Sequence, residues 1–176
     1  MYEETIRSLD AAVGRCLRDQ VLDRDRPDYG GHFNAKHGFA GASHVGNAAF
    51  IHQVALAYLV PDSRYHADPD VLHRILLAIG FQKRSTRSSG YVDIPQTNFD
   101  SPPDTGFVLQ QLGSVAHILA QSQDVAGALE IEDALTPYLT VCAHAVASGG
   151  IHTPNHRWVV ASGLALVHAL HPDPVV

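Results

Sequence analysis

Cysteine is scarce in this chain of 176 residues, which has only Cys16 and Cys142. Both lie inside helical patterns, so buried free thiols are expected and a disulfide framework is not indicated. Long apolar runs are absent too, since no uncharged stretch reaches the roughly 18 residues of a membrane span. The segment Met1–Arg7 lacks the basic start and apolar core of a signal peptide. These absences predict a cytoplasmic protein, or a secreted one if a leader has been removed.

Charge is also limited. Charged residues make up 17% of the chain and the formal net charge is −6, which excludes nucleic acid and an anionic membrane surface as general partners. A local basic patch could still hold an acidic substrate. Hydrophobic residues make up 45%, which is typical of an ordered globular protein. The length suits one domain over residues 1–176 with a sizeable core.

Hydrophobic side chains recur at helical spacing in six segments, and no strand pattern competes with them. We therefore expect an all-α chain. The predicted helices span about 2–22, 46–60, 69–82, a stretch from 104 onward, 125–148 and 153–170. Pro137 predicts a kink in the fifth helix, or a break with Thr136 capping its second piece. The second and sixth helices are apolar nearly all round, which predicts that both are buried inner helices.

The sixth helix has the most informative start. Gly149 and Gly150 predict a turn, Thr153 is a good N-cap residue, and Pro154 suits the first helical position. Asn155 and His156 would therefore project from the opening turn, where free backbone N–H groups and the positive end of the helix dipole attract anions.

Two segments together carry a family resemblance: Ile151-His-Thr-Pro-Asn-His-Arg-Trp158 and Asn98-Phe-Asp-Ser-Pro-Pro-Asp-Thr-Gly-Phe107. From about Asp28 onward the chain resembles the heparinase II/III-like polysaccharide lyases. That resemblance implies an (α/α) toroid of helical hairpins, of which this chain would form about half, since the family continues with more toroid and a β-sandwich. It also implies that Asn155 binds a uronate carboxylate and that His156 is a base or a neutralising partner.

The chemistry implied is β-elimination on an acidic polysaccharide or oligosaccharide. Negative charge spreads onto the uronate carboxylate, so an amide and a helix N-terminus suit its stabilisation. A histidine at a helix N-terminus is favoured in its neutral, basic form. The leaving oxygen is usually protonated by a tyrosine, and the two long loops over residues 23–44 and 83–103 offer Tyr29 and Tyr91. The further substrate-binding candidates are Arg157, Asn98 and His152.

No cofactor or metal is expected. His32, His37 and His44 match no zinc spacing, and Pro154 interrupts the pair formed by His152 and His156.

Other interpretations stay open. Asn155 and His156 could simply cap the helix and satisfy core hydrogen bonds. The chain could be a non-catalytic or truncated helical domain that binds sugar or only assembles. It could also be a hydrolase of acidic oligosaccharides, with two carboxylic acids drawn from Asp93, Asp100 and Asp104.

Assembly is a further expectation. Three helical hairpins would leave an open apolar edge, so we expect a homodimer or a higher symmetric assembly. Its interface would use apolar residues of the first, fifth or sixth helix.

Overall fold

The computed structural model describes residues 1–149, 153–173 and 175 and confirms the all-α class. The helices are α1 (Tyr2–Arg18), α2 (His44–Leu59), α3 (Pro69–Ser85), α4 (Pro102–Ala120), α5 (Ala128–Ala147) and α6 (Pro154–Leu170), with a short 3₁₀ turn, η1 (Ala40–Ala42), before α2. Within the described part of the chain, no helix combines the length and apolarity needed to cross a membrane.

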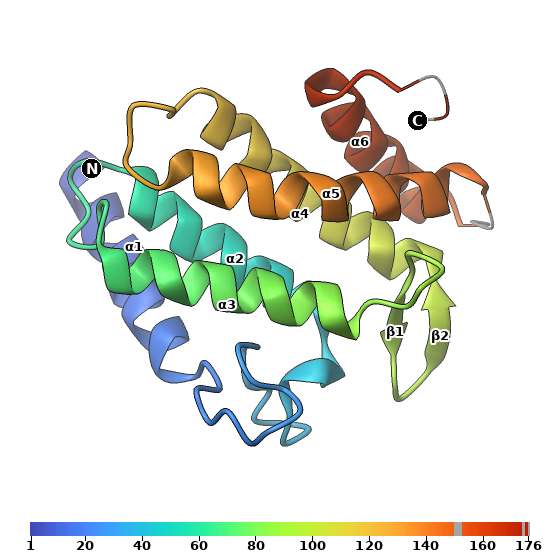
Figure 1. Ribbon diagram of the computed structural model, residues 1–176, viewed down its shortest axis with the longest axis horizontal. Helices are drawn as coiled ribbons and strands as arrows, with labels where there is room; N and C mark the ends of the chain where they lie inside the picture. The colour runs from blue at the N-terminus through green and yellow to red at the C-terminus, as the bar shows by residue number, and fades with distance from the viewer. Residues whose placement is uncertain (150–152, 174, 176) are drawn as a thin grey trace.

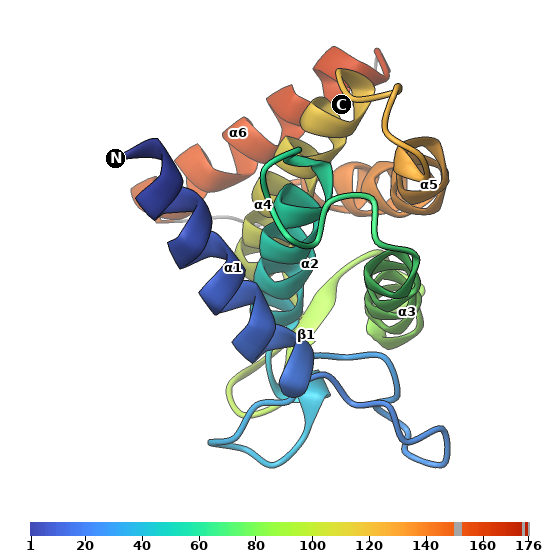
Figure 2. The same ribbon diagram turned by 90° about the vertical axis from the view of Figure 1, so that its left-hand side faces the viewer.

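The helices form layers around a central pair. α2 and α4 lie side by side in the middle, α3 and α5 cover one side, and α1 and α6 lie on the other (Figures 1 and 2). Fully buried side chains of the central pair, such as Ile51, Leu109 and Leu112, form the middle of the core. The predicted burial of the second helix is therefore confirmed. Both cysteines are free, with Cys142 buried and Cys16 half-buried.

The predicted burial of the sixth helix is wrong. Only Val160, Gly163 and Val167 of α6 are buried, and the side of the helix that carries Trp158 faces solvent, with that residue 78% exposed. The reason is position: α6 lies at the edge of the molecule and packs mainly on α4, so only one stripe of its apolar surface is covered.

The expectation that no strands occur is also wrong. A small antiparallel hairpin, β1 (Val92–Ile94) and β2 (Asn98–Ser101), stands inside the segment predicted as a loop (Figure 1). Val92 pairs with Ser101 and Ile94 with Asn98. Strands of three and four residues are too short for alternation to show in the sequence, and this hairpin is stabilised by its contact with α4.

Several helix boundaries differ from the prediction, and the end of α1 differs most. α1 ends at Arg18 because the chain after it pairs with the following loop, where Val21 N donates to Gly31 O at 2.9 Å. α5 is one helix from Ala128 to Ala147, so the alternative with a break at Pro137 is wrong. Pro137 is exposed. It has no N–H to donate to the carbonyl four residues earlier in the helix, and that carbonyl can accept from water instead.

A series of buried side-chain hydrogen bonds connects α2, α3 and α5. Asn47 Nδ2 donates to Gln82 Oε1 at 2.8 Å, and Gln82 Nε2 donates to Tyr138 Oη at 3.1 Å. Asn47 Oδ1 accepts from the backbone N–H of His32 at 3.0 Å. Because these groups satisfy one another inside the core, they fix how α2, α3 and α5 sit relative to each other.

Glycines allow α4 and α6 to approach closely. A side chain at Gly106 would meet Val160 Cγ2 at 2.5 Å, and one at Gly163 would meet Leu109 Cβ at 2.9 Å and Gly106 O at 3.3 Å. No larger residue fits at this crossing without a shift of one helix. The crossing therefore sets where the start of α6 lies.

We expect Gly163→Leu to destabilise the protein although leucine is the better helix former. The new side chain would collide with Leu109 and the backbone of Gly106, and overpacking of this kind costs about 1–3 kcal/mol. Urea denaturation measures the change in free energy of unfolding. The matched control is His73→Leu at an exposed position of α3, which should change stability by less than about 0.5 kcal/mol. Equal stability of the two variants would contradict the role given to this contact.

Candidate functional site

The starts of α2, α4 and α6 meet at one end of the molecule, beside the β1–β2 hairpin (Figure 1). At the start of α2, Ser43 is the N-cap residue and its Oγ accepts from Gly46 N at 3.0 Å. α4 and α6 both begin with proline, and Thr153 is the N-cap residue of α6, as the sequence predicted. Helix starts expose backbone N–H groups, so this end has the polarity of an anion-binding region.

Thr105 docks the hairpin onto the first turn of α4. Its buried Oγ1 donates to Ser101 O at 2.7 Å and accepts from Val92 N at 3.0 Å. These two bonds place β1 next to the starts of α2 and α4.

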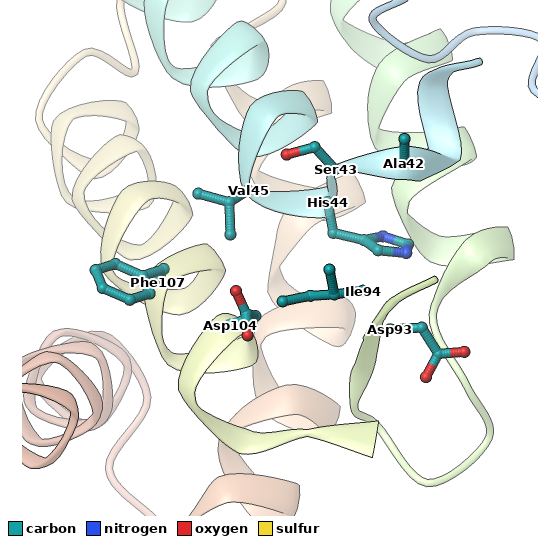
Figure 3. Close-up of a pocket in the computed structure, with 8 residues that line it drawn as sticks. All are labelled: Ala42, Ser43, His44, Val45, Asp93, Ile94, Asp104 and Phe107. Atoms are coloured by element: carbon teal, nitrogen blue, oxygen red, sulfur yellow. The ribbon is translucent and has the colours of Figure 1, made fainter. Parts of the chain in front are cut away.

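A cavity of about 270 Å³ lies between these elements. It is lined by Ala42, Ser43, His44, Val45, Asp93, Ile94, Asp104 and Phe107. Figure 3 shows the side chains at the start of α2 facing those from β1 and from the start of α4. The lining combines apolar surface with one imidazole and two carboxylates, a mixture that is typical of small-ligand sites.

His44 is the buried titratable group of this cavity, with only 4% of its surface exposed. Burial lowers the pKa of its imidazole, and the negative charges of Asp93 and Asp104 oppose that shift in part. One ring nitrogen, Nδ1, lies 3.5 Å from Ser85 Oγ. His44 is therefore a neutral imidazole near pH 7, able to accept or donate a hydrogen bond.

The two carboxylates are held by neighbours. Arg87 Nε donates to both oxygens of Asp93 at 2.7 Å, and Asp100 N donates to Asp93 Oδ1 at 2.8 Å. Asp104 Oδ2 accepts from Ser101 Oγ at 2.5 Å. Both side chains are thus fixed in place before any ligand binds.

His156 lies next to this cavity through Phe107. The two rings pack edge to face with centroids 6.1 Å apart, and Phe107 lines the cavity. His156 is half-buried, and its Nδ1 lies 2.6 Å from Thr153 Oγ1. Asn155 and Arg157 are exposed on the same opening turn of α6.

The other predicted substrate-binding residues are spread more widely. Asn98 is exposed on β2 and pairs with Ile94, which lines the cavity. Tyr91 does not present its hydroxyl to a ligand, because that group donates to Ala145 O at 2.5 Å. Tyr29 is half-buried in the loop after α1, where its carbonyl accepts from Arg84 at 2.7 Å. His152 lies outside the described residues.

His44 and Phe107 were not assigned to a site from the sequence. Ser43 before an apolar helix is the same N-cap signal as Thr153, and it could have placed His44 at a helix start. No local pattern in the sequence indicates that the ring of Phe107 would line the cavity and also pack on His156.

Over residues 1–149, 153–173 and 175, no group of three or more His, Cys, Asp or Glu side chains could hold a metal ion. His32, one of the scattered histidines, stacks on Phe50 with centroids 5.3 Å apart.

Comparisons with protein-family models, with curated proteins and with solved structures found no match to this chain.

The buried imidazole makes stability depend on pH. Unfolding releases His44 to an ordinary pKa of about 6.5, whereas burial in the folded state lowers that pKa. As pH falls, His44 is therefore protonated in the unfolded chain before it is protonated in the folded one. The free energy of unfolding decreases below the unfolded pKa of about 6.5, by at most about 1.4 kcal/mol per pH unit. We expect His44→Gln to lose less stability than the wild type between pH 7.5 and 5.5, as measured by urea denaturation at both values. An equal loss would show that His44 does not resist protonation.

Proposed function

We propose that this chain is a polysaccharide lyase-like domain that binds a uronate-containing polysaccharide where α2, α4 and α6 begin. The observation that carries the proposal is the packing of His156 on Phe107. It brings the turn with Asn155 and His156 beside a cavity with a mixed polar and apolar lining.

Each part of a uronate ring has a suitable partner here. The carboxylate suits the opening turn of α6, where backbone N–H groups, the helix dipole and the exposed amide of Asn155 all favour an anion. The C–H faces of the sugar suit the apolar lining formed by Val45, Ile94 and Phe107. The carboxylates Asp93 and Asp104 suit sugar hydroxyl groups, which donate hydrogen bonds to them.

In the proposed reaction, His156 removes the proton on the carbon next to the carboxylate. The electron pair left behind forms a carbon–carbon double bond as the bond to the glycosidic oxygen breaks. Asn155 and the α6 N-terminus stabilise the negative charge that develops on the carboxylate in the transition state. The departing oxygen must gain a proton, and water can supply it where no side chain does.

One observation favours the alternative that the domain binds a saccharide without cleaving it. The hydroxyl of Tyr91 donates a hydrogen bond to Ala145 O and lies 3.2 Å from Ser148 Oγ, on the α5 side of the hairpin. This tyrosine is therefore not poised to protonate a leaving oxygen beside His156.

Another observation favours the second alternative, a hydrolase that uses two carboxylic acids. Asp93 and Asp104 line one cavity, which supports them as the acid pair among the three candidates that the sequence left open. Hydrolysis needs one of the pair protonated as a general acid.

The test is incubation with uronate-containing polysaccharides, followed in the near ultraviolet, where the unsaturated ends of an elimination absorb. We expect His156→Ala to lower the rate by at least about 100-fold, the usual contribution of a general base. His73→Ala, an exposed histidine on α3, is the matched control and should keep the full rate. An unchanged rate in His156→Ala contradicts the catalytic assignment.

The same substrates separate the alternatives. New reducing ends without ultraviolet absorbance would indicate hydrolysis by the acid pair. Binding in calorimetry without any product would indicate the non-catalytic domain. In that case Phe107→Ala should weaken binding, because it removes apolar lining from the cavity.

We also propose that the chain self-associates through the exposed side of α6. Trp158, Ala161, Ala165 and Ala169 are exposed at spacings of three and four residues, so they form one stripe along the helix. Small side chains next to a large aromatic one allow a second helix to pack closely.

Light scattering at micromolar concentration measures the assembly. We expect a dimer for the wild type and a monomer for Trp158→Ser, because the largest exposed apolar side chain of the stripe is lost. Phe99→Ser, which removes an exposed aromatic ring from the hairpin, should leave the dimer intact. A monomeric wild type would overturn this part of the proposal.

A further inference from the structure

Four arginines surround a hollow on the outer surface of α1, away from the cavity described above. Arg7, Arg15 and Arg18 come from α1, and Arg64 comes from the connection between α2 and α3. The hollow has a volume of about 450 Å³, and Asp10, Ala11 and Gly14 complete its lining. No residue lines both this arginine hollow and the cavity at the starts of α2 and α4.

The positions on α1 explain why the cationic side chains gather. Arg7, Ala11, Gly14 and Arg18 follow one another at spacings of three and four residues, so they share one side of the helix. The side of α1 that carries Val13 packs into the core. The arginine side is therefore turned to solvent, where Figure 2 shows α1 at the edge of the molecule.

Arg64 is held in place at the rim of the hollow. Its Nη2 donates to Tyr65 Oη at 2.5 Å and lies 3.5 Å from Asp10 O, and its guanidinium stacks over the Tyr65 ring at 4.7 Å. A guanidinium fixed in this way loses little conformational freedom when it binds a ligand.

Gly14 forms the floor between two of the cations. A side chain at Gly14 would lie 2.9 Å from Arg64 Nη2 and 4.0 Å from Arg18 Nη1. Both guanidinium groups therefore lie around the same backbone position, and the missing side chain leaves room between them.

The positive charges of the hollow are not neutralised by ion pairs. Among the residues that the structure describes, no carboxylate lies within 4.0 Å of the guanidinium nitrogens of Arg7, Arg15, Arg18 or Arg64. Asp10 is the one carboxylate in the lining, and its oxygens accept from Ser63 Oγ at 2.6 Å and from the backbone N–H of Arg64 at 3.2 Å. In a chain with a formal net charge of −6, four gathered cations form a local site for an anion.

We infer that the arginine hollow binds a tetrahedral oxyanion, a phosphate or sulfate group, as a free ion or as an ester on a saccharide. Guanidinium groups present paired N–H donors that match the oxygens of such a group. Several converging guanidinium groups favour a doubly charged anion over a single carboxylate. This inference does not depend on the proposed function, because it concerns other residues and no reaction.

The test is calorimetric titration of the full chain with inorganic sulfate and inorganic phosphate at low ionic strength. We expect the double variant Arg15→Gln and Arg18→Gln to weaken binding by at least about tenfold, since each loses a charge-assisted hydrogen bond. Arg24→Gln removes one charge from the exposed loop after α1 and should change the affinity less than twofold. Ala11→Glu, which places a carboxylate at an exposed position inside the hollow, should also abolish binding while α1 stays helical.

A sulfated oligosaccharide distinguishes the sources of the anion. If the oligosaccharide competes with inorganic sulfate for the wild type, and this competition is lost in Ala11→Glu, the ligand is a sulfate ester. If the oligosaccharide does not compete, the ligand is the free ion. Two results overturn the inference: a wild type that binds neither inorganic anion, or an equal loss of affinity in the double variant and in Arg24→Gln. The second result would show only a general attraction of anions to positive charge.

Discussion

The glycine contact between α4 and α6 is the constraint on which the candidate site depends. Gly106 and Gly163 let the two helices approach until Val160 and Leu109 fill the space between them. This approach sets the position of the first turn of α6, and only there can His156 meet Phe107 at 6.1 Å. A wider crossing would keep every helix and still separate the Asn155–His156 turn from the cavity.

Three helix starts at one end give that end its chemistry. Their N–H groups and dipoles favour negative charge, while burial keeps His44 neutral by lowering its pKa. Asp93 and Asp104 are fixed by Arg87 and Ser101, so the polar lining is arranged before a ligand arrives. Preorganised groups of this kind bind more tightly than mobile ones, since little freedom is lost on binding.

Local signals in the sequence were enough for some of this structure. The all-α class, the burial of α2 and the start of α6 at Thr153 and Pro154 follow from periodicity and capping, and all are found. Periodicity could not show which apolar helix lies at an edge, so α6 was wrongly expected to be buried. The β1–β2 hairpin was missed because its strands are short and because the hydrogen bonds of the Thr105 side chain that hold it leave no periodic pattern in the sequence. The cavity was missed because its lining residues come from three separate segments of the sequence.

We propose that the starts of α2, α4 and α6 form one saccharide-binding end. Amide chemical-shift mapping by NMR during titration with a uronate oligosaccharide is the decisive measurement. We expect the largest shifts on the opening turns of all three helices, at Val45, Phe107 and His156. Shifts that spare the start of α6, or that fall only on α1, would contradict it.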